Sequence, residues 1–337
     1  MSKIKYLIRC IIRMDYKGLF QAVNRIHKRS KKPRIPLFFD IVKCGLKFGA
    51  GYWDYELFGW WDLNDAERAT HLTRGINNTL VKICNAPEAR SVLIDKVEFN
   101  EFFSDVIGRK WIKITPETTL SEFEEFMHGL RFIISKPLDE CGGKGVEKLD
   151  REDFEDLGAL LSHLISSGNG ICEEYIVQHS EMSRLYPVSV NTLRLVSIID
   201  DGGDSHILYA AVRFGNGGRV VDNISSGGLT APIDVETGTV SNTAFDKGFN
   251  YYEVHPYTDT KIVGFEIPMW QEAMELVKRS ALRIPKLRYV GWDIAITENG
   301  PIIVEANHVP GIHFIQIPAH TPDKIGVLPL FRKYIKF

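Results

Sequence analysis

The segment that most constrains the fold is GWDIAITENGPIIVEAN, residues 291–307. Two apolar runs of strand-forming residues flank a turn signal at 298–300, which predicts a β-hairpin. Counting back from a three-residue loop places Asp293 directly opposite Glu305 on the neighbouring strand. Alternate residues of a strand share a face, so Asn307 lies on the same side of the sheet. The hairpin therefore predicts that two carboxylates and an amide oxygen meet on one face.

A divalent cation is the physical reason to gather these groups among Ile, Val and Ala side chains. Two carboxylates that close repel each other, and desolvation adds to the cost. Mg²⁺ takes oxygen ligands and is normally shared with phosphate oxygens. A two-residue Asn-Gly loop would shift the register by one and point Asp293 away from Glu305. The metal interpretation therefore requires an odd loop, and the alternative is a strand pair with scattered solvent-facing polar residues.

The second feature is KPLDECGGKGV, residues 136–146, in which a strand delivers Lys136 to a glycine-rich loop. Glycines let backbone N–H groups approach a polyphosphate closely, and lysines add positive charge. The loop residues with these properties are Gly142, Gly143, Lys144 and Gly145. The spacing matches neither a P-loop nor GxGxxG, so the motif taken alone favours a plain surface turn.

The third feature is CEEYIVQHSE, residues 172–181, a predicted strand with two acids at its start. Its backbone from Glu174 to Ile176 offers hydrogen bonds to an adenine edge. Glu181 lies downstream at a distance suited to ribose hydroxyl groups. Without the other motifs, this segment is simply an edge strand.

Charge is distributed unevenly along a chain that is otherwise typical of a soluble globular protein, with 44% hydrophobic residues and a net charge of −2. Residues 1–34 contain eleven Lys or Arg and one acid, Asp15, so they carry +10 and the rest carries −12. The near-neutral total argues against a nucleic-acid binder. The five cysteines form no CxxC pair, which disfavours a disulfide framework or zinc site and fits a reducing cytoplasm.

Residues 3–28 have the apolar spacing of an amphipathic helix, which the segment KKPRIP ends. Arg9 and Arg13 interrupt the apolar run, so it fails as a signal peptide, and no stretch is long enough to span a membrane. Two interpretations remain. The helix docks on its own domain with a solvated basic face, or residues 1–34 contact an anionic membrane or a partner such as a glycosyltransferase. The expected location is the cytoplasm, either free or at the inner face of the membrane.

The overall pattern is α+β. Residues 1–90 are predicted to be a mainly helical N-terminal region, and residues 91–178 to form one α+β subdomain. Residues 179–337 are predicted to be a core subdomain with a large antiparallel sheet and a helix at 268–283.

In order along the chain, six motifs resemble the ATP-grasp superfamily, and most closely its sugar-transfer-associated branch, which is found with polysaccharide biosynthesis. They are LIDKVEF (93–99), ISKPLDECGGKGV (134–146), EEYIVQH (173–179), SVNTLRLVS (189–197), VRFGNGGRVVDNISSGGL (212–229) and GWDIAITENGPIIVEANHVPG (291–311). The resemblance covers about residues 90–315 and implies the ATP-grasp fold, in which two α+β subdomains clasp ATP. The first 90 residues do not resemble the N-terminal domain that many of these ligases use for their acceptor.

The resemblance also implies roles for individual residues. Lys96 and Lys136 match lysines that contact phosphates, loop 142–145 matches the segment covering the triphosphate, and Glu181 matches the ribose acid. The residues matching the adenine-holding hinge are Glu173, Glu174, Tyr175 and Ile176. The residues matching the Mg²⁺ ligands are Asp293, Glu305 and Asn307. Arg213 resembles the arginine that steadies the γ-phosphate, and Asn223 resembles a residue of the loop closing on the substrate. Asn191 and Arg194 lie on a strand of the same core, where Arg194 either binds a substrate carboxylate or forms a structural salt bridge.

The function implied is an ATP- and Mg²⁺-dependent ligase that makes an acyl-phosphate and passes the acyl group to an amine. The substrates expected are a carboxylate and an amine such as an amino acid, peptide or amino sugar. Two alternatives stay open: an ATP-dependent phosphotransferase, or a non-catalytic ATP-binding scaffold that docks a membrane glycosyltransferase.

Overall fold

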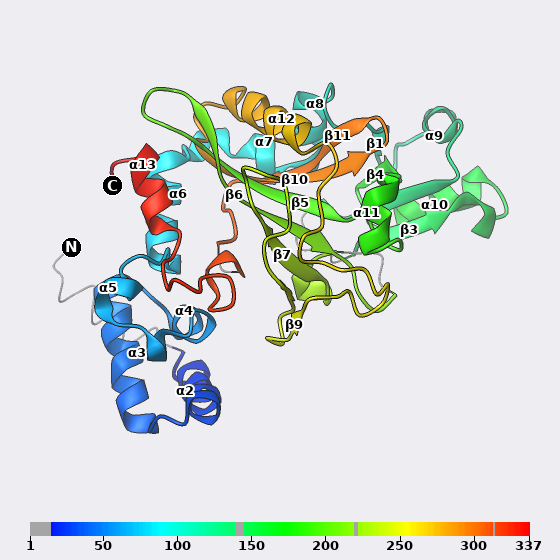
Figure 1. Ribbon diagram of the computed structural model, residues 1–337. Helices are drawn as coiled ribbons and strands as arrows, with labels where there is room; N and C mark the ends of the chain where they lie inside the picture. Colours follow the sequence, from blue (N-terminus) through cyan, green and yellow to red (C-terminus); the bar gives the residue numbers. More distant parts are fainter. Residues whose placement is uncertain (1–14, 139–144, 219–221, 313) are drawn as a thin grey trace. The chain divides into compact units, whose positions relative to one another are not determined.

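The computed structural model describes residues 15–138, 145–218, 222–312 and 314–337, and the chain packs as two compact units (Figure 1). The first unit is Met1–Ile83 with Gly311–Phe337, and the second is Cys84–Pro310. The C-terminal residues 311–337, which the sequence suggested belong to the sheet-containing core, thus pack with the N-terminal helices. One reason is Gln316, whose buried side chain accepts a hydrogen bond from Leu72 N (2.8 Å) and donates one to Leu72 O (3.1 Å).

The first unit is helical, as predicted. Its elements are α2 (Tyr16–Ser30), α3 (Arg34–Phe48), α4 (Tyr52–Leu57), η1 (Trp60–Asp62), α5 (Asp65–Arg68), α6 (Arg74–Cys84), η5 (Phe314–Gln316) and α13 (Leu328–Tyr334). The predicted break at KKPRIP is confirmed, because α2 ends at Ser30 and α3 begins directly after Pro33. The predicted helix over 3–28 is confirmed from Tyr16 onward, and residues 1–14 lie outside the described part. Within the described residues, none of the helices has the length and apolarity needed to cross a membrane.

The core of the first unit includes an aromatic cluster. Trp60 is fully buried and packs edge-on against Phe48 and Tyr55. Beside it, Arg68 pairs with Asp40 (2.6 Å). The aromatic cluster thus serves packing.

The second unit contains a four-stranded antiparallel sheet of order β1-β4-β2-β3. The strands are β1 (Trp111–Lys113), β2 (Phe132–Lys136), β3 (Glu147–Asp150) and β4 (Ile171–Glu174). Side chains such as Ile133 and Cys172 form a small core with α9 (Leu120–Met127) and α10 (Leu157–Ser167). The turn η3 (Arg151–Asp153) precedes α10, which begins where the Asp156 side chain caps Ala159 N (2.8 Å).

The second unit also contains a seven-stranded antiparallel sheet of order β11-β10-β5-β6-β7-β8-β9. The strands are β5 (Thr192–Ile199), β6 (Ser205–Phe214), β7 (Leu229–Ile233), β8 (Ala244–Phe245), β9 (Tyr251–Tyr252), β10 (Tyr289–Thr297) and β11 (Gly300–Asn307). The remaining elements are η2 (Pro87–Ala89), α7 (Ser91–Ile94), α8 (Lys96–Phe102), α11 (Ser180–Leu185), η4 (Ile224–Ser226) and α12 (Trp270–Leu282). The helix predicted at 268–283 is therefore confirmed as α12.

The period of two in the strands divides this large sheet into an apolar and a polar face. Leu193, Val212 and Trp292 point into a core that includes α12, which lies along β5, β6, β10 and β11 (Figure 1). Their sequence neighbours Arg194 and Asp293 point to the opposite face. Arg194 and Asp293, which the sequence analysis singled out, thus lie on the face of the large sheet that α12 does not cover.

Candidate active site

The hairpin of β10 and β11 places Asp293 opposite Glu305, as predicted, but through a different turn. Thr297 pairs with Gly300, so the loop has two residues and the predicted three-residue loop is wrong. A two-residue loop alone would have shifted the register by one residue. A β-bulge next to Asp293 leaves Val304 unpaired and restores the opposition.

Asp293 is buried between the strands β11 and β5, where its neighbours are Glu305 and Arg194. Arg194 donates from Nε to Oδ1 (2.5 Å) and from Nη2 to Oδ2 (3.0 Å). The Nη2 atom of Arg213 on β6 lies 2.7 Å from Oδ2 of Asp293. Asn307 follows two residues after Glu305 and donates from Nδ2 to its Oε1 (3.3 Å). The predicted metal ligands and both predicted arginines therefore form one cluster.

The two acids of this cluster have opposite pKa shifts. Burial by itself would raise the pKa of Asp293, but the guanidinium groups of Arg194 and Arg213 overcome that effect and hold the pKa well below its usual range. Glu305 reaches solvent, yet the protein packed around it and the neighbouring Asp293 charge raise its pKa above the ordinary value. The cluster therefore combines a buried acid whose ionised form is stabilised with a solvent-exposed acid that is protonated more readily than an ordinary glutamate.

Arg213 is held by partners that the sequence did not single out, Thr192 and Asp222. Its Nε and Nη2 atoms donate to Thr192 Oγ1 at 3.1 and 2.8 Å, and the Thr192 hydroxyl donates to Asp222. Asp222 also accepts from Thr192 N (3.1 Å), and burial raises the pKa of Asp222. Arg213 is therefore fixed between two carboxylates.

The predicted residue Asn223 follows Asp222 in a tight loop. Its carbonyl accepts hydrogen bonds from Ser226 N (2.9 Å) and Gly228 N (3.0 Å). A Cβ atom at Gly228 would lie 2.1 Å from Asp222 O, so the loop requires glycine there. This loop starts at the edge of the polar cluster because Asp222 is anchored on β5.

The predicted phosphate lysine Lys136, on β2, forms an ion pair with Glu173 on β4 (2.5 Å). Glu173 is buried and also accepts from Asn100 Nδ2 (3.0 Å) and from Arg109 through Nε and Nη2 (3.0 Å each). Burial would raise the pKa of Glu173, but the charges of Arg109 and Lys136 hold it well below its usual range. The Glu173 carboxylate is thus engaged inside the protein, where it positions Lys136.

Arg109 also contacts the hairpin of β10 and β11, and this contact connects the two sheets. It donates from Nη1 to Ile303 O (2.8 Å) and from Nη2 to Val304 O (3.0 Å). Val304 is the extra residue of the bulge that brings Asp293 opposite Glu305. One guanidinium therefore holds both the bulge and the acid that pairs with Lys136. Nothing in the local sequence GRKW marks Arg109 for this role.

The second predicted phosphate lysine, Lys96, lies at the start of α8. Its Nζ donates to the carbonyls of Pro137 (2.9 Å) and Leu138 (2.7 Å), directly after β2. Gly145 has a φ of +67°, and its Cβ would meet Pro137 at 3.0 Å. Gly142, Gly143 and Lys144 lie outside the described residues. Both lysines and the described end of the glycine loop thus surround the end of β2.

The predicted hinge follows β4. Glu174 accepts from Lys110 N (3.0 Å), and Tyr175 N donates to Phe132 O (3.3 Å). The Nζ of Lys148 lies 3.7 Å from the centre of the Tyr175 ring, and Ile176 is half-buried. The strand predicted within residues 172–181 therefore ends at Glu174.

The remaining two predicted residues have local partners. Glu181 is exposed on α11 and pairs with Arg184 (2.6 Å). Asn191 is buried, and its Nδ2 donates to Met182 O (2.7 Å) and Tyr186 O (2.8 Å). The amide of Asn191 thus holds the segment around α11 instead of joining the polar cluster.

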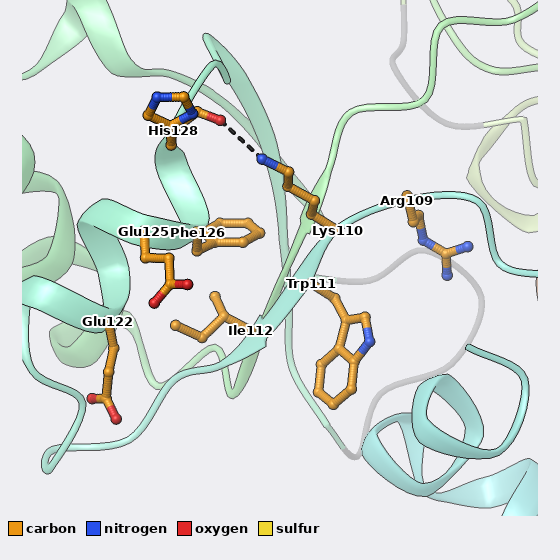
Figure 2. A pocket seen from close by; sticks show the side chains of 8 residues that line it. All are labelled: Arg109, Lys110, Trp111, Ile112, Glu122, Glu125, Phe126 and His128. Atoms are coloured by element: carbon orange, nitrogen blue, oxygen red, sulfur yellow. Dashed lines mark hydrogen bonds between the residues drawn. The ribbon is translucent and has the colours of Figure 1, made fainter. Parts of the chain in front are cut away.

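A surface cavity of about 660 Å³ lies elsewhere, between β1 and α9 (Figure 2). Its lining includes Trp111, Glu122, Glu125 and Phe126, and none of the predicted site residues. Within the described residues, no three His, Cys, Asp or Glu side chains gather as a metal site. A metal at the hairpin would therefore rely on two carboxylates, an amide oxygen and ligands from a bound molecule.

The family model for "Sugar-transfer associated ATP-grasp" matches residues 75–322, which is more than half of the chain. Among curated proteins, no sequence is significantly similar to this chain.

Several solved structures share part of the fold. A D-alanine–D-alanine ligase from Bacillus anthracis has 16% identity and a TM-score of 0.42, covering 76% of this chain and 72% of that chain. The ATP-grasp ligase PsnB, solved with a precursor variant, Mg and ADP, has 17% identity and a TM-score of 0.41, covering 87% and 72%. An L-amino acid ligase from Bacillus licheniformis has 11% identity and a TM-score of 0.44, covering 74% of this chain and 49% of that one. Similarities this low assign no activity or substrate to this chain.

Proposed function

This chain belongs to the sugar-transfer-associated ATP-grasp family, and on that premise we propose that it is an ATP- and Mg²⁺-dependent ligase that joins a carboxylate to an amine. The observation that carries the proposal is the opposition of Asp293 and Glu305, with Asn307 on the same strand face and Arg213 against Asp293. Two acids beside a fixed arginine suit a site that handles a metal-bound polyphosphate.

The donor set fits Mg²⁺ if the nucleotide binds with it. Asp293, Glu305 and Asn307 would supply oxygen ligands, which Mg²⁺ prefers. However, both oxygens of Asp293 already contact guanidinium groups, so the site beside Arg194 and Arg213 disfavours a cation on its own. A triphosphate would reverse this balance, because its oxygens bind Mg²⁺ and its negative charge faces the arginines.

The proposed reaction has two steps. A substrate carboxylate attacks the γ-phosphate of ATP, releasing ADP and forming an acyl-phosphate. An amine then attacks the acyl carbon, forming an amide and releasing phosphate. Bound Mg²⁺ would supply neutralisation of the charge that develops on the transferred phosphoryl group.

The protein's own residues would orient the substrates and stabilise charge. Arg213, held by Thr192 and Asp222, presents a cation that needs no rearrangement during the reaction. Lys136, held by Glu173, would contact the phosphates from the other sheet. Arg194 forms a salt bridge with Asp293, and we propose that it orients this metal ligand and also faces the substrate carboxylate.

The family's description as sugar-transfer-associated supports a substrate from polysaccharide biosynthesis. The expected pair is a sugar acid, amino acid or peptide carboxylate with an amino acid, peptide or amino sugar as the amine.

A mass-spectrometric screen of candidate carboxylates and amines with ATP and Mg²⁺ tests the proposal. The expected result is a product lighter by one water than its two substrates, with ADP and phosphate released only when both are present. Asp293→Asn should abolish the product, whereas Arg131→Gln, at an exposed ion pair, should not. A phosphorylated product with no amide would instead identify a phosphotransferase. ATP binding without turnover would identify a scaffold, and ADP formation independent of both substrates would also contradict ligase activity.

A further inference from the structure

The first unit presents an apolar stripe on the outer side of α3 that has no role in the proposed chemistry. Ile35, Phe39 and Leu46 are 72%, 65% and 59% exposed. With a rotation of about 100° per residue, these positions and the half-buried Val42 fall within about 60° of one another around the helix. The inner side of the same helix buries Leu37, Ile41 and Cys44, so α3 is apolar on two sides. Packing within the unit explains the apolar inner side of α3 but not the apolar outer side.

The stripe continues onto α2. Phe20 is 55% exposed and stacks on Phe38 with ring centroids 5.7 Å apart. Phe38 in turn contacts Phe39 edge-on. The buried face of α2 is made by other residues, including Leu19, Val23 and Ile26. The outer faces of both helices therefore form one surface, which we call the α2–α3 surface.

Basic residues flank the α2–α3 surface. Residues 15–48 contain nine Lys or Arg and two acids, Asp15 and Asp40. Lys43 and Lys47 lie beside the stripe and share a single acid, Asp65 (3.2 and 2.8 Å). Within the described residues, Lys28, Lys31 and Arg34 form no ion pair, and Arg34 donates to Asn24 (2.7 Å). Arg25 and Arg29 pair with Glu56, and Lys32 pairs with Asp62, so the positive charge beside the stripe comes from the remaining lysines and arginines.

From this combination we infer that the α2–α3 surface docks the protein on an anionic lipid membrane, a role that goes beyond the proposed ligase activity. A helix face with exposed Phe, Ile and Leu between lysines and arginines inserts its apolar side chains at the headgroup boundary while its cations meet lipid phosphates. A second copy of the chain fits this surface poorly. A two-fold contact would set the same positive patches against each other, and like charges repel.

Flotation of the full chain with lipid vesicles tests this inference. Vesicles of equal parts phosphatidylcholine and phosphatidylglycerol should bind the protein, and phosphatidylcholine vesicles should bind it far less. High salt should release it, because surface charges are screened. The variant Phe39→Ser/Leu46→Ser should bind at least about tenfold more weakly, since two exposed apolar side chains are lost. Lys28→Gln/Lys31→Gln should weaken binding about fivefold per lysine. Ile83→Ser, which changes another half-exposed apolar residue of the same unit, should bind like the wild type.

Thermal unfolding of each variant shows whether the fold is kept, which is expected because all substituted side chains are exposed. Three results would overturn the inference. The first is no vesicle binding by the wild type. The second is binding that persists in Phe39→Ser/Leu46→Ser, which would assign it to residues outside the surface. The third is salt-resistant dimerisation of the wild type that the same variant abolishes, because the stripe would then be covered by a second copy.

Discussion

The contact between Arg109 and Glu173 offers the sharpest test of how the two sheets are connected. Their side chains are 2% and 5% exposed, and Arg109 reaches the carbonyls of Ile303 and Val304 as well. Replacing Arg109 with Met keeps an apolar stem and removes the charge. Breaking a buried ion pair from one side costs about 3–5 kcal/mol when the remaining charge is left without a partner. Glu173 keeps Lys136 as a partner, so the loss from this pair should lie at the lower end of that range. The carbonyls of Ile107, Ile303 and Val304, which lose this donor, add to the cost.

Arg131→Met is the matched control within the same unit. Arg131 also pairs with acids, Asp150 and Glu152, but its side chain is 54% exposed. An exposed pair contributes about 0–1 kcal/mol. Urea unfolding followed by circular dichroism should therefore place Arg109→Met several kcal/mol below both the wild type and Arg131→Met. Equal losses in the two variants would refute the view that Arg109 ties the sheets together.

The loss of unfolding free energy in Arg109→Met should be larger at neutral pH than at acidic pH. In the wild type, Arg109 and Lys136 lower the pKa of Glu173, so the ionised carboxylate stabilises the folded state. This contribution to the free energy of unfolding is present above the ordinary glutamate pKa of about 4.3 and is lost as pH falls further. In the variant, Glu173 accepts a proton more readily and its buried charge disappears. The gap in unfolding free energy between the two proteins should therefore be widest at neutral pH and narrow below about pH 4. A gap that widens on acidification would contradict this assignment.

Three further predictions concern the hairpin and its neighbouring loop. Because the pKa of Glu305 is raised, Mg²⁺·nucleotide affinity in calorimetric titrations should fall on acidification with a midpoint above about 4.3, and Glu305→Gln should remove that dependence. Mg²⁺ alone should bind far more weakly than Mg²⁺ with ADP, and strong Mg²⁺ binding without nucleotide would contradict this expectation. Asp293→Asn should reduce ATP turnover by about 100-fold or more. Gly228→Ala should lower the free energy of unfolding by about 1–3 kcal/mol through its clash with Asp222 O, whereas Gly311→Ala, which meets nothing within 4 Å, should change it little.

Much of the fold can be predicted from local sequence patterns. Alternation of apolar and polar residues predicts the strands of the large sheet, and the Pro in KKPRIP predicts the break between α2 and α3. The predicted helix and hairpin boundaries differ from the structure by a few residues. Where a local cap is present, as at Asp156 before α10, a side-chain hydrogen bond at the first turn selects where the helix begins.

The local sequence is enough to predict that Glu305 and Asn307 share a strand face, because the side-chain period of two is a property of every strand. It did not determine the register. The short turn alone would have separated Asp293 from Glu305, and the bulge at Val304 brings them together.

That register depends on a contact between distant parts of the chain, because Arg109 binds the Val304 carbonyl from nearly two hundred residues away. The same is true of Lys136, whose partner Glu173 is held by this guanidinium. Contacts between such distant residues depend on how whole sheets pack, and local sequence patterns carry no record of them.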